Sequence, residues 1–295
     1  MDAARPLYDP ANLYKLSYVR DMLAYHDIRL RKSLGQSFLF DHNGVEKIVR
    51  AAAPTSNDVV LEVGPGMGHL TYALLQRVKH VIAVEIDDRL LPILKGLLGD
   101  RDNFTLVHAD ILKADVSARC AELGLLPTMV VANVPYYITT PILTHLVGSG
   151  LPLRRVALTI QREVAERYIA QPGGKEYGSI SVVVKYWGDA QVTGILGPRS
   201  FFPRPKVESA ILRIDMHATP PVGIANEQLF YRVVRMAFQQ RRKKLRNALK
   251  ALAVEGYALD EALAAARLDG GRRAETLSLE DYARLADALV VTAAR

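Results

Sequence analysis

Residues 59–68, Val-Val-Leu-Glu-Val-Gly-Pro-Gly-Met-Gly (VVLEVGPGMG), join an apolar run of strand length to a loop with glycine at every second position. Glycine allows a chain to turn tightly and lets its backbone approach a ligand closely. The next segment, residues 69–78, has the apolar spacing of a helix. A strand, a glycine turn and a helix in this order indicate an α/β unit and make the turn a candidate ligand site.

Two common kinds of glycine loop do not match this stretch. A dinucleotide fingerprint requires a glycine three residues after the second one, and that position, counted from Gly66, is His69. A phosphate-binding loop would continue with Gly-Lys-Ser or Gly-Lys-Thr, and this loop does not. The glycines by themselves leave an ordinary turn between a strand and a helix as an alternative.

Outward from the glycine loop, apolar segments of strand length alternate with helical patterns. We expect strands at Val59–Val63, 81–86, 104–107, 129–132, 156–160, 192–196 and 207–214, and helices at 14–30, 69–78, 89–98, 141–147 and 162–170. This alternation predicts an α/β fold with a mostly parallel sheet covered on both faces. The segment Ser179–Trp187 (SISVVVKYW) is compatible with a strand or a helix.

Composition limits the classes of protein that remain. The sequence contains no run of 18 apolar residues, so we expect no membrane span. The amino-terminal residues lack the apolar segment of a secretion signal. The single cysteine, Cys120, fits a reducing cytoplasm. The sequence has no Cys/His cluster at metal-ligand spacing, so we expect no metal site. A formal charge of +7 is compatible with a nucleic-acid partner. After the linker 219–221 (Thr-Pro-Pro) the pattern becomes helical, which predicts two domains, 1–216 and 217–295.

Four consecutive predicted strands end in residues that suit one ligand. They are Gly64, Glu85, Asp110 and Asn133. In open parallel sheets ligands bind beyond the carboxyl ends of the strands, so these residues are expected to share a crevice. Glu85 can accept from both ribose hydroxyls, and Asp110 from an adenine amino group, although Asp110 could instead cap the next helix. These residues suit a ligand that has a ribose and an adenine but needs no phosphate-binding loop. S-adenosylmethionine is such a ligand.

Longer motifs carry a resemblance to a known family over nearly the whole chain. They are KSLGQSFLFD, EVGPGMG, AVEID, HADIL, ANVPYYITTPIL, QREVAERYIA, PRSFFPRPKVESAILRI, AFQQRRKKLRNAL and RAETLSLEDYARLADAL. In these motifs the chain resembles the class I S-adenosylmethionine-dependent methyltransferases. Among these methyltransferases, it is similar to the small-subunit (16S) rRNA adenine N6,N6-dimethyltransferases of the KsgA type. The resemblance implies a Rossmann-like methyltransferase domain with an amino-terminal helix and basic loop over 1–216, and a helical RNA-binding domain over 217–295.

The resemblance also implies the residues that hold the cofactor S-adenosylmethionine and its product S-adenosylhomocysteine. They are Ser37, Leu39, Gly64, Gly66, Glu85, Ile86, Asp110, Ile111 and Asn133. Ser37 departs from the family pattern, which usually has Asn or His at that position. The expected contact between this side chain and the cofactor is therefore open.

The stretch Asn133-Val134-Pro135-Tyr136 is expected to hold the target adenine. The N6 amino group is a poor nucleophile, so two acceptors aimed at its protons would favour tetrahedral character at nitrogen. The Asn133 amide oxygen is one acceptor, and the carbonyl of Val134 or Pro135 is the other. Tyr136 would stack on one face of the base. Phe201 would stack on the other face, or would close the edge of the core.

A basic segment is expected to bind RNA. Residues 228–254 contain no acidic side chain, and their spacing places Arg232, Arg235, Gln239, Arg242 and Arg246 on one helical face. The candidate RNA-binding residues are Arg235, Arg241, Arg242, Lys243, Lys244 and Arg246. Arg199, Arg204 and Lys206 extend this set. A solvated helix face is the alternative, but the missing counter-charges favour neutralisation of phosphates.

The predicted activity is dimethylation of N6 on two adjacent adenines in the 3′-terminal hairpin loop of small-subunit rRNA. The expected setting is cytoplasmic ribosome biogenesis, with a monomeric enzyme, an assembling 30S particle as partner, and neither membrane nor metal. One alternative is a large-subunit rRNA adenine methyltransferase of the macrolide-resistance type. The other is a non-catalytic ribosome-assembly or transcription factor with the same fold.

Overall fold

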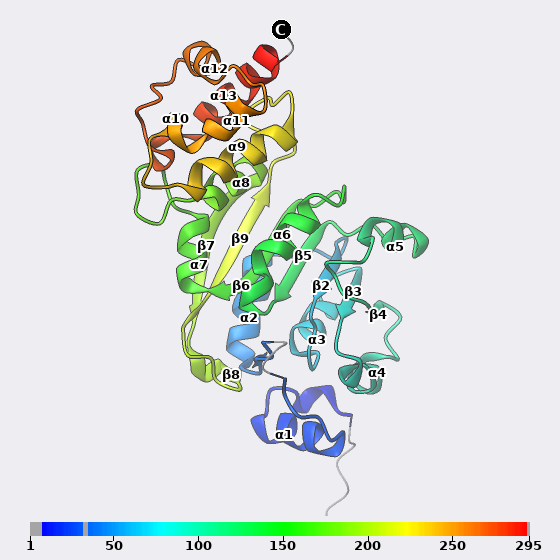
Figure 1. Cartoon of the computed structure of the whole chain (residues 1–295). Coiled ribbons are helices and arrows are strands. Elements are labelled where there is room, and N and C mark those ends of the chain that lie inside the picture. Colours follow the sequence, from blue (N-terminus) through cyan, green and yellow to red (C-terminus); the bar gives the residue numbers. More distant parts are fainter. Residues whose placement is uncertain (1–7, 32–34, 294–295) are drawn as a thin grey trace, which may run out of the picture. The chain divides into compact units, whose positions relative to one another are not determined.

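The computed structural model describes residues 8–31 and 35–293, so Lys32 and two further residues of the KSLGQSFLFD motif lie outside it. The chain divides into two compact units (Figure 1). Unit 1 comprises the described residues up to Ala165 together with Gln191–Met216. Unit 2 comprises Glu166–Ala190 and the described residues from His217 onward.

Unit 1 contains the predicted α/β sheet. Its strands are β2 (Val59–Val63), β3 (His80–Glu85), β4 (Phe104–His108), β5 (Met129–Asn133), β6 (Arg155–Gln161), β7 (Gly188–Leu196, whose first residues belong to unit 2) and β9 (Ser209–Met216). They lie in the order β4-β3-β2-β5-β6-β9-β7. Neighbours from β4 to β6 are parallel, and β9 pairs antiparallel with β6. The mostly parallel sheet is therefore confirmed.

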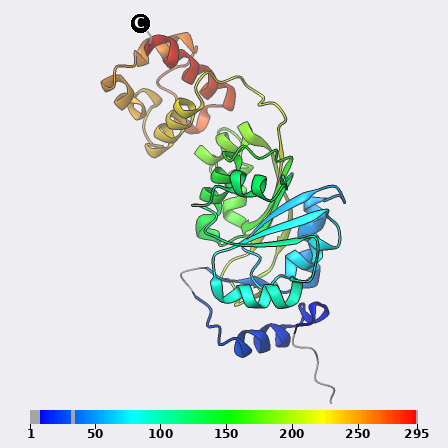
Figure 2. The ribbon, with the colours of Figure 1, turned by 90° about the vertical axis from the view of Figure 1, so that its right-hand side faces the viewer.

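Helices cover both faces of this sheet, with α6 (Thr139–Val147) on one face and α2 (His42–Ala52) on the other (Figures 1 and 2). The other α-helices described in unit 1 are α1 (Leu16–Tyr25), α3 (His69–Leu75), α4 (Leu91–Leu98), α5 (Val116–Glu122) and the first residues of α7 (Arg162–Tyr168), which continues into unit 2. Because both faces are covered, β2 is buried along its whole length. This explains why its sequence is a continuous apolar run and does not alternate.

Helices α2 and α5 and the short strands β1 (Phe38–Leu39) and β8 (Phe201–Phe202) escaped the sequence analysis. Helix α2 begins after Asp41, whose carboxylate accepts from the backbone N–H of Asn43, and it buries Val45 and Ile48 in the core. A two-stranded ribbon pairs β1 with β8 in antiparallel register. Strands of two residues are too short to show a period, so only tertiary pairing reveals them.

In unit 2 the described helices are α8 (Ser179–Trp187), α9 (Glu227–Gln239), α10 (Leu245–Ala248), α11 (Lys250–Val254), α12 (Leu259–Ala265) and α13 (Leu279–Ala293). The ambiguous segment is thus a helix, and it buries Val182 and Tyr186 one turn apart. Tyr186 packs against Phe230 of α9. Helix α8 therefore belongs to the core of unit 2, whereas a single boundary near residue 217 had assigned it to the first domain.

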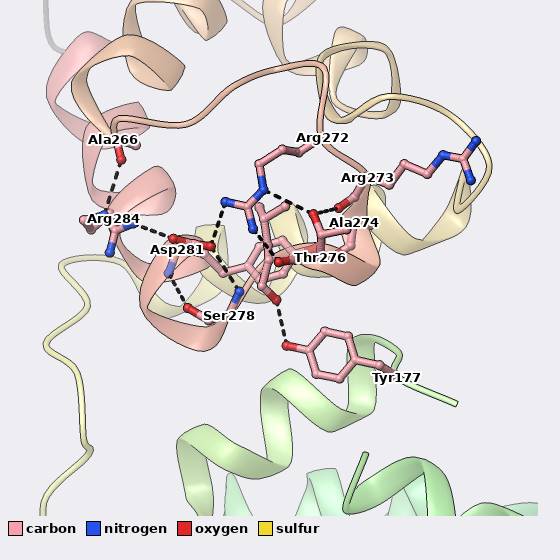
Figure 3. A network of polar contacts seen from close by, with 11 residues as sticks. Tyr177, Ala266, Arg272, Arg273, Ala274, Thr276, Ser278, Asp281 and Arg284 are labelled. Atoms are coloured by element: carbon pink, nitrogen blue, oxygen red, sulfur yellow. Dashed lines mark hydrogen bonds and ion pairs between the residues drawn. The ribbon is translucent and has the colours of Figure 1, made fainter. Parts of the chain in front are cut away.

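A capping box begins α13 (Figure 3). The Asp281 carboxylate accepts from the backbone N–H of Ser278 at 3.2 Å, and the Ser278 hydroxyl accepts from the backbone N–H of Asp281. Arg272 and Arg284 donate to the same carboxylate, at 3.1 and 2.5 Å. The segment before α13 is thereby held in place.

Candidate active site

One pocket opens at the carboxyl ends of β2, β3 and β5, where the strand order changes direction between β2 and β5. It encloses about 1100 Å³, including space open to solvent. Of the sequence-predicted cofactor residues, every one lines it: Ser37, Leu39, Gly64, Gly66, Glu85, Ile86, Asp110, Ile111 and Asn133. Val134, Pro135 and Tyr136 line it as well. The expected crevice is therefore present in unit 1.

The glycine loop and Glu85 form one wall of this pocket. Gly64 and Gly66 have φ values of 67° and 60°, which disfavour any residue with a Cβ. A Cβ at Gly66 would also lie 2.9 Å from the ring of Phe38. The Glu85 carboxylate accepts from the backbone N–H of Gly66 at 3.2 Å, and from those of Ile86 and Asp87 at 2.9 Å. These bonds aim the carboxylate, while burial raises its pKa.

Glu62 is a buried carboxyl group that the sequence analysis quoted in a motif but did not assign to the site. It lines the pocket, is 1% exposed, and its Oε2 atom has no hydrogen-bond partner among the described residues. Burial, with a smaller contribution from the charge of Glu85, raises the pKa of Glu62 to about 8. A charged residue inside an apolar strand was the signal that could have identified it.

The residues present fit S-adenosylmethionine. The unpaired oxygen of Glu62 offers a partner to a polar group of a ligand, and buried polar atoms in folded proteins are rarely left unpaired. Leu39 and Ile111 are buried and supply apolar walls beside the polar groups of Glu85 and Asp110. Such a lining, apolar with a few directed polar groups, suits a nucleoside.

Asp110 both caps the segment that follows it and lines the pocket, the two roles that the sequence left open. Its carboxylate caps the following turn by accepting from the backbone N–H of Leu112 at 3.1 Å, and it lies 3.7 Å from the ammonium of Lys113. It is half-buried and also lines the pocket. The cap orients the carboxylate, so the two interpretations do not exclude each other.

Asn133 is the last residue of β5 and lines the pocket. Its Nδ2 donates to the backbone carbonyl of Ser37 at 3.2 Å, which fixes the orientation of the amide. The Ser37 hydroxyl donates to the carbonyl of Pro203 at 2.8 Å. Tyr136 is half-buried and its hydroxyl lies 2.5 Å from the hydroxyl of Ser209. Tyr137, for which the sequence suggested no role, is exposed at the pocket lining.

Phe201 is not placed to stack on a target base. It is 2% exposed, belongs to the hydrophobic core, and does not line the pocket. The reason is the ribbon, in which Phe201 pairs with Leu39 of β1. The Phe201 ring therefore closes the edge of the core, as the alternative interpretation expected. Its predicted role in stacking on the target adenine is wrong.

Gln36 and Asp87 support the site and were missed. The Gln36 side chain donates to the Asp87 carboxylate at 2.6 Å and accepts from the backbone N–H of Arg31 at 2.9 Å. Burial would raise the pKa of Asp87, but hydrogen bonds from Arg89 and Gln36 lower it overall. Polar contacts between segments so distant in sequence leave no local pattern.

Comparison with known proteins assigns the family. A family model described as "Ribosomal RNA adenine dimethylase" matches residues 28–290. The chain belongs to this family. The predicted family, and with it the enzyme class of S-adenosylmethionine-dependent rRNA adenine dimethyltransferases, is confirmed.

Relatives of this dimethylase agree with the assignment. "Ribosomal RNA small subunit methyltransferase A" of Lysinibacillus sphaericus is 44% identical over 276 residues, covering 92% of this chain and 94% of the relative. The protein of that name in Bacillus pumilus is 42% identical over 281 residues, with the same coverage. A crystal structure of a dimethyladenosine transferase from Plasmodium falciparum has a TM-score of 0.67 at 25% identity, covering 82% of this chain and 94% of that one. The 23S rRNA methyltransferase ErmE has a TM-score of 0.62 at 26% identity, with coverages of 86% and 99%.

The basic segment of the dimethylase is not one continuous helical face. Helix α9 ends at Gln239, so the expected extension of its face through Arg242 to Arg246 is wrong. The backbone of Lys244 instead bridges to Arg273 in antiparallel fashion, and the N–H of Leu245 donates to the carbonyl of Arg272 at 2.7 Å. This pairing with a distant segment takes residues 240–244 out of the helix.

Among the RNA-binding candidates, some side chains are engaged within unit 2 and others are free. Arg246 forms an ion pair with Asp260 at 3.0 Å, and Arg241 donates to the carbonyl of Lys175 at 2.5 Å. The free ones are exposed and have no side-chain partner in the described part of the chain: Arg235, Arg242, Lys243 and Lys244. These four retain their full capacity for phosphates.

No group of three or more His, Cys, Asp or Glu side chains within residues 8–31 and 35–293 is arranged to hold a metal ion. In the same described ranges, no helix combines the length and the apolar character needed to cross a membrane.

Proposed function

We propose that the protein transfers methyl groups from S-adenosylmethionine to N6 of two adjacent adenines in small-subunit rRNA. Family membership and the small-subunit methyltransferases that match 92% of the chain support this substrate. The observation that carries the proposal is the orientation of Asn133 in the pocket. Because its Nδ2 donates to the Ser37 carbonyl, its Oδ1 is left to accept from an amino group.

The chain's own residues orient the nucleophile. The Asn133 Oδ1 accepts one N6 proton, and a main-chain carbonyl of Val134 or Pro135 accepts the other. Together they favour tetrahedral character at the nitrogen, so that its lone pair becomes available. Tyr136 stacks on the base. The rate acceleration comes from positioning and preorganised dipoles, because no strong base is required.

The cofactor, when bound, supplies an activated methyl group on a sulfonium. Glu85 holds its ribose, Asp110 the adenine end, and the glycine loop approaches it at Gly64 and Gly66. Glu62 supplies a further polar partner through its Oε2 atom. These roles rest on the lining of the pocket and on the directed carboxylates described above.

The substrate is expected within an assembling 30S particle in the cytoplasm, and the enzyme acts as a monomer. The target lies in the 3′-terminal hairpin loop, and the flipped adenine enters the pocket. The exposed cations Arg235, Arg242, Lys243 and Lys244 neutralise phosphates of this RNA.

Substitution of Asn133 tests the activity directly. With unmethylated small subunits and labelled cofactor, Asn133→Ala is expected to lower methyl transfer by about a thousandfold, the scale of losing one directed transition-state partner. Affinity for S-adenosylmethionine should change only a few-fold. Asn43→Ala, at an exposed asparagine outside the pocket lining, is the matched control.

Offering the wild-type protein unmethylated small subunits and, separately, unmethylated 23S rRNA, and then mapping the modified bases, separates the alternatives. Label on adjacent small-subunit adenines supports the proposal, and label on 23S rRNA alone would support the large-subunit activity instead. Wild-type turnover in Asn133→Ala would contradict the assigned chemistry, and no transfer to either RNA would favour a non-catalytic factor.

The phosphate role is tested by Arg242→Ala combined with Lys243→Ala. RNA affinity should fall, and the slope of log affinity against log salt should decrease by about 1 for each cation removed. The control is Arg119→Ala, an exposed arginine of α5 that pairs with Glu122. An unchanged salt slope in the double variant would contradict the proposed surface.

A further inference from the structure

The loop of residues 203–208 has a serine hydroxyl bond at each end, one to Ser37 and one to Tyr136, and both of these residues line the pocket. At its start, the hydroxyl of Ser37 donates to the carbonyl of Pro203 at 2.8 Å. At its end, Ser209 lies 2.5 Å from the hydroxyl of Tyr136 and is fully buried. Both bonds join groups far apart in sequence, so they depend on the folded state.

The Ser37 bond continues the ribbon between β1 and β8. Phe38 pairs with Phe202, and the next pair along this register is Ser37 with Pro203. Proline has no backbone N–H and cannot donate to the ladder. The pair is joined instead through the acceptor that Pro203 retains, because the Ser37 hydroxyl donates to the Pro203 carbonyl. A residue without a donor at this position would let the ribbon end one pair earlier.

Ser37 also contacts the catalytic amide. Its backbone carbonyl accepts from Asn133 Nδ2 at 3.2 Å, so a displacement of residue 37 would move the partner that orients Asn133. One residue therefore touches both the loop and the proposed adenine acceptor. No described residue donates a hydrogen bond to the Ser37 hydroxyl or accepts one from it other than Pro203.

The loop itself is built to meet an anion. Arg204 and Lys206 are exposed, and neither side chain has an ion pair or hydrogen bond among the described residues. The acidic residue of the loop, Glu208, is neutralised by Arg162 at 3.0 Å. The loop therefore presents two unpaired cations and begins at Pro203, which is bonded to Ser37 of the pocket lining, and such cations suit an RNA phosphate.

We propose that Ser37 is a positioning residue on the target side of the site, and that it couples the phosphate-binding loop 203–208 to Asn133. This rests on the proposed function. It assigns Ser37 a role different from the cofactor contact that the family pattern implies. Binding of RNA by Arg204 and Lys206 holds the loop, and the Ser37 hydroxyl transmits that position to the amide that accepts from N6.

The test compares Ser37→Ala with Ser37→Thr, which retains a hydroxyl. Ser37→Ala should lower kcat on small-subunit RNA by about tenfold, since it removes one hydrogen bond and loosens a catalytic group. Its affinity for S-adenosylmethionine, measured by calorimetry, should stay within about twofold of the wild type, because the lost hydrogen bond joins Ser37 to Pro203 and not to the cofactor. Ser37→Thr should restore kcat. The melting temperature of both variants should match the wild type.

A second variant examines the loop. Arg204→Ala combined with Lys206→Ala should raise KM for RNA. Ser37→Ala should then lower kcat by a smaller factor in this double variant than it does in the wild-type protein. Weakened cofactor binding in Ser37→Ala, with kcat unchanged at saturating cofactor, would overturn the proposal. So would full activity in Ser37→Ala. If Asn133→Ala is inactive in the same assay, either result overturns the role of Ser37 and leaves the proposed function standing.

Discussion

Two buried carboxyl groups stand at opposite ends of the same strand, and their surroundings are opposite. Asp58 precedes β2 at its amino end and is saturated with donors: Arg154 at 2.9 and 2.6 Å, the backbone and hydroxyl of Thr55 at 2.6 and 2.8 Å, and Thr128 at 2.7 Å. Glu62, near the carboxyl end, has an oxygen with no partner in the described chain.

The two groups titrate in opposite directions for this reason. Burial would raise the pKa of Asp58, but its hydrogen bonds with Arg154 and the two threonines hold that pKa well below its usual range. Burial raises the pKa of Glu62 to about 8 because too few donors compensate the lost hydration. A saturated carboxylate stabilises the fold, whereas an unsaturated one costs stability and is available to a ligand.

The largest effect on stability is expected at the saturated end. Asp58→Ala removes the acceptor of hydrogen bonds from Arg154, Thr55 and Thr128 and should lower the free energy of unfolding by about 4 kcal/mol. The stabilisation by Asp58 is present above its unfolded pKa and is lost as the pH falls below it, so the variant should also lose that acid dependence. Urea unfolding measures both.

Asp102→Ala, at an exposed carboxylate, serves as the control for Asp58→Ala. Cofactor affinity of the folded fraction should remain that of the wild type. A weakened affinity of Asp58→Ala for S-adenosylmethionine would contradict the comparison, in which the Asp58 end of β2 serves stability and the Glu62 end serves the ligand.

The next effect is expected at Glu62. The folded pKa is about 8, above its usual 4.5. The native state therefore retains a proton that the unfolded state releases, and wild-type stability falls as the pH rises from about 4.5 to 8. Glu62→Gln should remove this loss, so its free energy of unfolding relative to the wild type should be greater at pH 8 than at pH 4.5 by about 4 kcal/mol.

Thermal unfolding across this pH range measures the difference between Glu62→Gln and the wild type. In the same variant, affinity for S-adenosylmethionine should fall about tenfold, because a ligand partner is altered. A stability difference that does not vary with pH would show that Glu62 is ionised in the folded protein.

The smallest effect is expected for Arg154→Lys. Lysine retains the charge but loses the planar fork that binds both oxygens of Asp58, so the free energy of unfolding should fall by about 1 kcal/mol. Arg119→Lys, in an exposed pair with Glu122, should change it by less than about 0.5 kcal/mol. Equal losses in the two variants would mean that the bidentate geometry at Asp58 contributes nothing.

The strands and the strand-end residues were predictable because burial and ligand chemistry both leave local patterns. Continuous apolar runs identified β2 and β5, and the residues that end them, Gly64 and Asn133, line the pocket. Phe201 was misplaced because its motif says nothing about the partner of its strand. The basic face was extended too far because three- and four-residue spacing persists in a sequence even where the helix has ended.

From the sequence alone follow the alternation of the main strands with helices, the class of fold and the polar groups delivered to one edge of the sheet, since these depend on periodicity and burial. Only the tertiary structure decides which distant groups meet. The pairing of β1 with β8 buries Phe201 and brings Ser37 to Pro203, and the pairing of Lys244 with Arg273 ends the basic helix. Such contacts join segments far apart along the chain, and the free energy that selects them comes from packing of the whole unit, which no local pattern records.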